Sequence, residues 1–439
     1  MNLDLKLKVA KKNIMGSFYP VGTRGESKGF DWEILTNLFI CEIYGLDISS
    51  SSKVEQKLND FENYCRSSFV QALDDPRAWD HLKKIYFDER NLVLISPKLC
   101  IYSIVDKIDS ANVEKRFLGL IKTLLKAGKI YQNYSEQLNF LEKIITKNFD
   151  KNFETKVSNE TLFVNYLPSL AEIFSNDLEF LIKYPKYFIE NIQLFIQIYI
   201  CIYTIQLSLT INSWQSFKDQ HLLQCYFILD FEKASQERNL LIQRGYKAVE
   251  KELSSIFPVL AMTESLQSAL KDKQPLWKFF EKINDVDLDE LNKYCEDFAL
   301  ERKLTLKTEK LSTHLETLKE LERLFKAQFS KTENSSERAG RNDNVVKDIK
   351  NIILKPFIKA RGRAGNLFVL NQEYLLLLTN LVIGENEQLR LYELIKGFEK
   401  RGIFFDRESH KALVLFYERL GNIEKMSDSG DAIYVKKTI

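Results

Sequence analysis

The sequence predicts a mostly α-helical protein with a large multi-helical N-terminal region and a C-terminal winged helix-turn-helix domain. Two observations predict the helices: the 439 residues include only 16 Gly and 8 Pro, and apolar residues recur at helical spacing from about residue 53 to residue 329. A third observation concerns the chain end, where residues 405–437 have the pattern of a helix, a glycine stop and two short strands.

Residues 1–329 are expected to form a helical scaffold domain, in one or two subdomains. Four glycines and a proline between residues 16 and 33 predict an irregular start. Asp31 then precedes an apolar helix that Gly45 ends. Further segments with helical spacing of apolar residues lie at 54–73, 113–128 and 287–329.

Residues 191–217 carry no charge over a length that could span a bilayer. However, Gln193, Gln197 and Gln206 interrupt the stretch, and each amide would cost free energy in hydrocarbon. We therefore expect a buried central helix and no membrane contact. The six cysteines form no C-x-x-C pair and no secretory signal opens the chain, so we expect a cytoplasmic protein with reduced thiols.

Residues 330–365 are expected to form a flexible linker followed by a basic arm. Segment 330–344 is polar and poor in apolar residues. Residues 347–365 then carry six Lys or Arg against Asp348 alone, a net charge of 6 − 1 = +5. Such arms reach a DNA groove or a phosphate backbone, and a solvated linker edge stays open as the alternative. The candidate contact residues of the arm are Lys355, Lys359, Arg361 and Arg363.

Residues 366–439 predict a winged helix through the order of their local signals. Asn371 and Asp406 are expected N-caps of the first and third helices. The expected helix stops are Gly384, Gly402 and Gly421. Two β-prone runs at the end flank a Ser-Asp-Ser-Gly turn, which is typical of a hairpin. Helix, helix, short strand, helix and hairpin is the order of a winged helix, and these signals agree with one another.

The third helix of this unit is the candidate contact element. One face, with Ala412, Leu413, Phe416 and Leu420, is expected to be core. The candidate contact residues on the other side and on the wing are Arg407, Ser409, His410, Lys411 and Lys425. Residues 365–439 contain ten Lys or Arg and eleven Asp or Glu, a net charge of −1. Because phosphate contacts dominate DNA affinity, this charge favours docking on a protein, with double-stranded DNA as the open alternative.

No motif for catalysis stands out. The sequence lacks a P-loop and an H-E-x-x-H motif, and its four histidines are far apart. Asp74, Asp75 and Asp80 surround Pro76 and are expected to be turn and cap residues, not a nuclease site. We therefore expect no catalytic residue, no cofactor and no metal, which means a protein that is not an enzyme.

Three segments, GRAGNLFVLNQEYLLLLTNLVIG, FDRESHKALVLFYERLGN and EKMSDSGDAIYV, resemble the DptG family of DNA phosphorothioation-dependent restriction proteins. The resemblance covers residues 360–439, and the helical remainder agrees with it in length and character. It implies a non-catalytic subunit of a bacterial anti-phage restriction system, which works beside an ATPase subunit and a helicase/nuclease-like subunit. A kleisin-like subunit that bridges a chromosome-organising ATPase complex stays open as the alternative.

Overall fold

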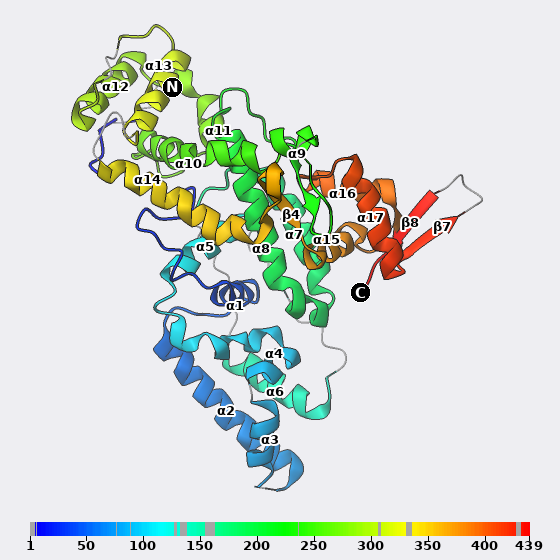
Figure 1. Cartoon of the computed structure of the whole chain (residues 1–439). Helices are drawn as coiled ribbons and strands as arrows, with labels where there is room; N and C mark the ends of the chain where they lie inside the picture. The colour runs from blue at the N-terminus through cyan, green and yellow to red at the C-terminus, as the bar shows by residue number, and fades with distance from the viewer. Residues whose placement is uncertain are drawn as a thin grey trace. The chain divides into compact units, whose positions relative to one another are not determined.

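The structure is a computed structural model of the whole chain. It describes residues 5, 7–75, 77–87, 89–126, 130–131, 138–153, 163–235, 237–305, 309–330, 336–426 and 432–439. Helices make up 62% of the chain, which confirms the mostly α prediction. The described residues form 17 α-helices and eight short strands (Figure 1).

The chain divides into two compact units. Unit 1 consists of Met1–Gly29, Leu162–Ile173 and Gln197–Thr438, and unit 2 consists of Phe30–Thr161, Phe174–Ile196 and Ile439. This division differs from the predicted one at 329/330 and 365/366. The C-terminal residues 366–438 share unit 1 with most of the second half of the predicted scaffold.

Unit 2 is built from amphipathic helices. The N-cap of α1 and the apolar stripe of α2 are both visible in the sequence. The Asp31 carboxylate accepts a hydrogen bond of 2.8 Å from the Glu33 amide at the start of α1, as predicted. Helix α2 buries one stripe of residues, in which the Phe61 ring meets the Phe149 ring of α6 edge to face at 5.4 Å. The helices of this unit are α1 (Trp32–Ile43), α2 (Ser51–Leu73), α3 (Ala78–Tyr86), α4 (Glu89–Ile95), α5 (Asn112–Lys122) and α6 (Phe140–Asn152).

Helices α7 (Pro168–Ile182) and α8 (Pro185–Thr210) contribute residues to both units. Within the part of the chain that the structure describes, α8 is the one helix whose length and composition would allow it to cross a membrane, with a mean hydropathy of 1.6. However, 83% of its apolar window is buried inside the protein. The hydroxyls of Thr204 and Ser208 donate to carbonyls one turn back, which satisfies these buried groups. The predicted buried helix is therefore confirmed, although it ends at Thr210 and not at residue 217.

Three further helices of unit 1, α9, α13 and α14, pack against α10, whose residues are mostly buried along its second half, and α12 packs against α13. The predicted charged segment 287–329 forms two helices, and Asp287 and Thr313 cap them. These elements are α9 (Asn239–Gln243), α10 (Tyr246–Leu266), α11 (Leu276–Phe280), α12 (Leu288–Arg302), α13 (His314–Ala327) and α14 (Ser336–Asp348).

The structure corrects the predicted flexible linker, as far as residues 336–365 are concerned. Helix α14 continues into a π-helical turn, Ile349–Leu354, that buries four apolar side chains. The Asp348 carboxylate is fully buried and accepts hydrogen bonds from the amides of Glu26 and Ser27 at 2.6 and 3.1 Å. Composition suggested a linker because the first half is polar, but the apolar residues after Asp348 anchor the end of α14 and this turn in the core.

The C-terminal elements include the three predicted helices, the predicted short strand and the last two strands, and they add one strand, Gln388–Arg390, that was not predicted. They are α15 (Gln372–Ile383), β5 (Gln388–Arg390), α16 (Leu391–Lys400), β6 (Ile403–Phe404), α17 (Arg407–Leu420), β7 (Ile423–Met426) and β8 (Ala432–Lys436). Asn371 and Asp406 cap α15 and α17, as predicted. The three predicted glycine stops all adopt positive φ angles. Strands β5, β8 and β7 form an antiparallel sheet in that order, while the predicted turn at 427–431 lies outside the described residues.

Two short parallel pairings join the C-terminal elements to earlier parts of unit 1. Strand β6 pairs with β1 (Cys225–Tyr226), and β4 (Asn366–Leu370) pairs with β2 (Ile228–Leu229). Strand β4 also pairs with β3 (Ile358–Ala360), which lies in the predicted basic arm. Residues 366–438 thus share unit 1 with earlier parts of the chain, because their strands complete small sheets with residues more than a hundred positions earlier.

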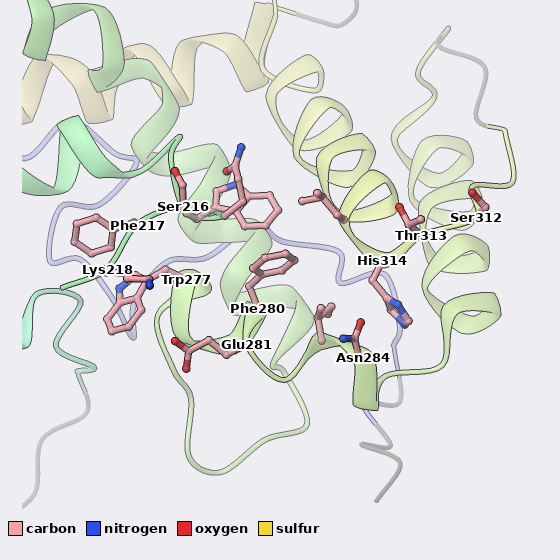
Figure 2. Close-up of a pocket in the computed structure, with 14 residues that line it drawn as sticks. Ser216, Phe217, Lys218, Trp277, Phe280, Glu281, Asn284, Ser312, Thr313 and His314 are labelled. Atoms are coloured by element: carbon pink, nitrogen blue, oxygen red, sulfur yellow. The ribbon is translucent and has the colours of Figure 1, made fainter. Parts of the chain in front are cut away.

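An open pocket of about 620 Å³ lies elsewhere in unit 1 (Figure 2). Its walls come from residues 214–218, from helix α11 with the turn after it, and from residues 312–315 at the start of α13. Aromatic side chains form much of the lining, and Lys218, Glu281 and His314 are among its polar groups. No local signal in the sequence predicts this pocket, because its walls come from three segments that are distant in sequence.

Candidate interaction site

The solvent face of α17 is the candidate interaction site, and the structure separates the residues predicted for it. Arg407 and Lys411 are exposed, whereas Ser409 is fully buried and His410 is half-buried. Burial lowers the pKa of His410, so its ring is neutral at neutral pH. The Lys411 ammonium forms an ion pair of 2.9 Å with Glu408, one turn earlier. Of the four predicted helix residues, two therefore face solvent.

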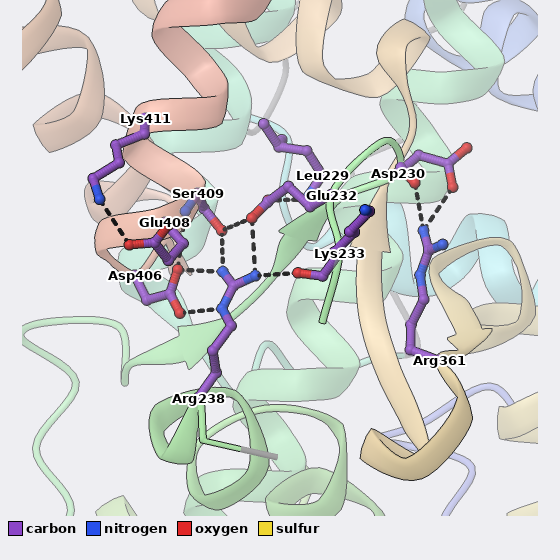
Figure 3. Close-up of polar contacts among 10 residues, drawn as sticks. All are labelled: Leu229, Asp230, Glu232, Lys233, Arg238, Arg361, Asp406, Glu408, Ser409 and Lys411. Atoms are coloured by element: carbon purple, nitrogen blue, oxygen red, sulfur yellow. Dashed lines mark hydrogen bonds and ion pairs between the residues drawn. The ribbon is translucent and has the colours of Figure 1, made fainter. Parts of the chain in front are cut away.

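Ser409 is buried because the start of α17 is held by Arg238, from the loop before α9 (Figure 3). The Arg238 guanidinium donates five hydrogen bonds: two to the Asp406 carboxylate, one each to the side chains of Glu232 and Ser409, and one to the Lys233 carbonyl. The Ser409 hydroxyl in turn donates to Glu232 Oε1 at 3.0 Å. All donors of the guanidinium are thus satisfied inside the protein, and Ser409 cannot contact DNA in this arrangement.

Asp406 links this network to the helix itself. One carboxylate oxygen, Oδ1, accepts from the Ser409 amide at 3.0 Å and caps α17. The other, Oδ2, accepts from Arg238 Nε at 2.6 Å. Burial works to raise the pKa of Asp406, but Arg238 outweighs burial and holds the pKa below its usual value. The side chains of Arg238, Glu232 and Asp406 are at most 10% exposed, so this cluster positions α17 and is closed to a ligand.

The predicted basic arm is held in a similar way. Arg361 Nη2 lies 3.0 Å from Asp230 Oδ1, and Lys359 Nζ lies 2.7 Å from the same oxygen. The hydrogen bond from Lys359 keeps the pKa of Asp230 below its usual value. Lys355 and Arg363 are exposed on short helical turns beside this pair. The arm is therefore a folded edge of unit 1, and one carboxylate offsets part of its positive charge.

The residue that sequence reasoning missed is Leu415. Its side chain is 53% exposed, and it lies one turn after Lys411 in the middle of the solvent face. The face also holds Arg407, Glu408 and Arg419, so charges of both signs surround the leucine. Helical spacing could have predicted that Leu415 is exposed, because residues four positions apart lie on the same face of a helix and Lys411 was already expected on the solvent face. Leu420, which was expected in the core, is 46% exposed because α17 ends there.

Lys425, the predicted wing residue, lies in strand β7 opposite Ile433 of β8. Its side chain lies outside the described residues. The structure thus places Arg407, Lys411 and Leu415 on the exposed side of α17, and Lys359 and Arg361 at Asp230.

Metal binding was not expected, and among the described residues no group of three or more His, Cys, Asp or Glu side chains is placed to hold a metal ion. The six cysteines are buried free thiols. No family model and no curated protein matches this chain. The resemblance of the C-terminal segments to the DptG family therefore remains a prediction.

Proposed function

We propose that residues 366–439 form a winged helix-turn-helix that serves as a docking module. The support is the order α15, β5, α16, β6, α17, β7, β8 together with the sheet order β5-β8-β7. In a winged helix the third helix carries the contact face and the last two strands form the wing, which corresponds here to α17 and the β7–β8 pair.

The chain in this proposal is a non-catalytic subunit of a bacterial DNA phosphorothioation-dependent restriction system. The resemblance of residues 360–439 to the DptG family supports this assignment. The subunit would work in the cytoplasm and bridge the ATPase and helicase/nuclease-like partners of that system. The free thiols agree with a reducing compartment.

The observation that carries the docking proposal is the exposed Leu415 at the centre of the α17 face. A DNA-reading helix presents donors to base edges, and its cations contact phosphates. Here an apolar side chain occupies the centre, Glu408 offsets Lys411, and Ser409 is buried. Apolar centres with a charged rim are typical of protein interfaces. Contact with double-stranded DNA through Arg407 and the arm is the weaker proposal.

The test compares Leu415→Asp with Leu300→Asp, a matched change at a leucine that is 76% exposed on α12. Each tagged chain is expressed in the native host, and its association with the proposed ATPase and helicase/nuclease-like subunits is measured by co-purification. Loss of the apolar contact and burial of a charge should weaken association by about 30-fold or more for Leu415→Asp. Leu300→Asp should leave it unchanged.

Equal association of both variants would refute docking through this face. A gel-shift titration with duplex DNA provides the second measurement. If Leu415→Asp keeps its partners while Arg407→Glu abolishes tight duplex binding, then α17 is a DNA-contacting helix and the docking proposal fails.

A further inference from the structure

The open pocket of unit 1 is lined by two copies of one short pattern, a Trp followed three residues later by a Phe. Residues 214–217 read Trp-Gln-Ser-Phe, and residues 277–280 read Trp-Lys-Phe-Phe. The two copies pair reciprocally: the Trp214 ring meets Phe280 at 5.1 Å, and the Phe217 ring meets Trp277 at 5.7 Å, both edge to face. This cross-pairing places four aromatic rings around one cavity (Figure 2).

Both indole rings are fixed by hydrogen bonds to the protein interior. Trp214 Nε1 donates to Glu322 Oε2 at 2.7 Å, and Trp277 Nε1 donates to the Tyr166 carbonyl at 3.1 Å. Trp214 is 1% exposed, whereas Phe217, Trp277 and Phe280 are half-buried. Because the polar atoms of the indoles already have partners, the rings present apolar surface to the cavity. The pocket is thus rigid and largely formed before binding, which lowers the entropy lost when a ligand binds.

The rim carries one exposed charge of each sign, Lys218 and Glu281. Among the described residues, no ion pair engages either side chain. Lys218 lies beside the Phe217–Trp277 pair, and Glu281 follows Phe280 at the end of α11. A matching ligand therefore has an apolar centre, a negative group near Lys218 and a positive group near Glu281.

This charge arrangement decides between a nucleic acid and a peptide. A single strand that stacks its bases on aromatic rings also needs a cationic track for its phosphates. Glu281 would repel such a backbone, and among the described residues that line the pocket Lys218 is the one Lys or Arg. A peptide can carry both signs of charge on either side of an apolar anchor, and large aromatic side chains dominate peptide and protein binding sites.

We propose that this pocket binds a short peptide segment of a partner protein in which a large apolar side chain stands between an acidic and a basic residue. The apolar side chain enters the space between the aromatic pairs. The acidic residue faces Lys218 and the basic residue faces Glu281. This surface is separate from the α17 face, so the chain has two docking sites.

The probe is a phage library of random dodecapeptides, selected on the intact full-length chain. Selected sequences are synthesised with a fluorescent label and their Kd is measured by polarisation. The variants are Phe217→Ala, which removes one ring, and Lys218→Glu, which reverses one rim charge. Lys278→Glu is the matched control, because Lys278 is exposed on the same short helix as Trp277 but does not line the pocket.

We expect the selected peptides to share an apolar residue flanked by an acid and a base. Binding should weaken at least tenfold for Phe217→Ala and about fivefold for Lys218→Glu, with less than a twofold change for Lys278→Glu. Replacing the acid of the peptide by lysine should restore binding to Lys218→Glu, which a general loss of folding could not do. Leu415→Asp should bind these peptides normally, so this test is independent of the docking proposal for α17.

Three results would overturn the proposal. In the first, the selected peptides share no sequence pattern. In the second, the selected peptides bind Phe217→Ala as tightly as they bind the original chain. In the third, a labelled twelve-residue oligothymidine binds with a Kd that rises in both pocket variants, which would identify a single-strand site instead.

Discussion

Replacing Arg238 by methionine should destabilise unit 1, because it leaves two buried carboxylates without their cation. Methionine keeps most of the side-chain length but donates no hydrogen bond. Asp406 and Glu232 have side chains that are 10% and 5% exposed, so water cannot replace the guanidinium without local opening. Removing one partner of such a buried pair costs about 3 kcal/mol of unfolding free energy. For a domain of this size, that loss lowers Tm by about 6 °C.

The assay is urea unfolding followed by circular dichroism at pH 7, with thermal scans as a second measurement. Arg238→Lys should lose about half as much unfolding free energy, because lysine keeps the positive charge but lacks the planar set of guanidinium donors. Combining Arg238→Met with Asp406→Asn should recover part of the loss, since asparagine still caps α17 but carries no charge. A change below about 0.5 kcal/mol for Arg238→Met, or additive losses in the double variant, would refute the reasoning.

The same network predicts a pH dependence. The pKa of Asp406 is lowered in the folded state, so its contribution to stability is present above the unfolded pKa of about 3.9. That contribution is lost as pH falls through the folded pKa. The stability difference between the original chain and Arg238→Met should therefore shrink as pH falls from 7 to below about 4. A difference that stays constant over this range would show that the network is not the cause.

Two further predictions concern the C-terminal elements. Deleting residues 366–439 should unfold much of unit 1, because β1 and β2 lose their partner strands; a truncated chain with an unchanged far-UV spectrum per residue would contradict this. Gly402→Ala should cost about 1–3 kcal/mol in urea unfolding, because its φ is +78° and a Cβ would lie 2.8 Å from Gln206 Nε2. Gly340→Ala is the control: nothing lies within 4 Å of its Cβ position, so it should be neutral or slightly stabilising.

The candidate site was predictable only in part. Arg407 and Lys411 could be placed on the solvent face of α17 from helical spacing, and the structure has them exposed. Ser409 could not be placed, because its burial depends on Arg238 and Glu232, which lie about 170 positions earlier. Lys359 and Arg361 belonged to a segment whose composition suggested a mobile arm. Their contact with Asp230 follows from the pairing of β4 with both β3 and β2, and no local signal specifies the β2–β4 pairing.

Caps, stops and helical stripes were determined by the sequence alone. Asn371 and Asp406 accept hydrogen bonds from amides three residues later, and Gly421 ends α17 with a positive φ, so each acts within one turn of its own position. The tertiary structure decided which of these elements form a unit. The pairings of β1 with β6 and β2 with β4 close long loops and depend on complementary packing of distant segments, whose free energy appears only once both partners are in place.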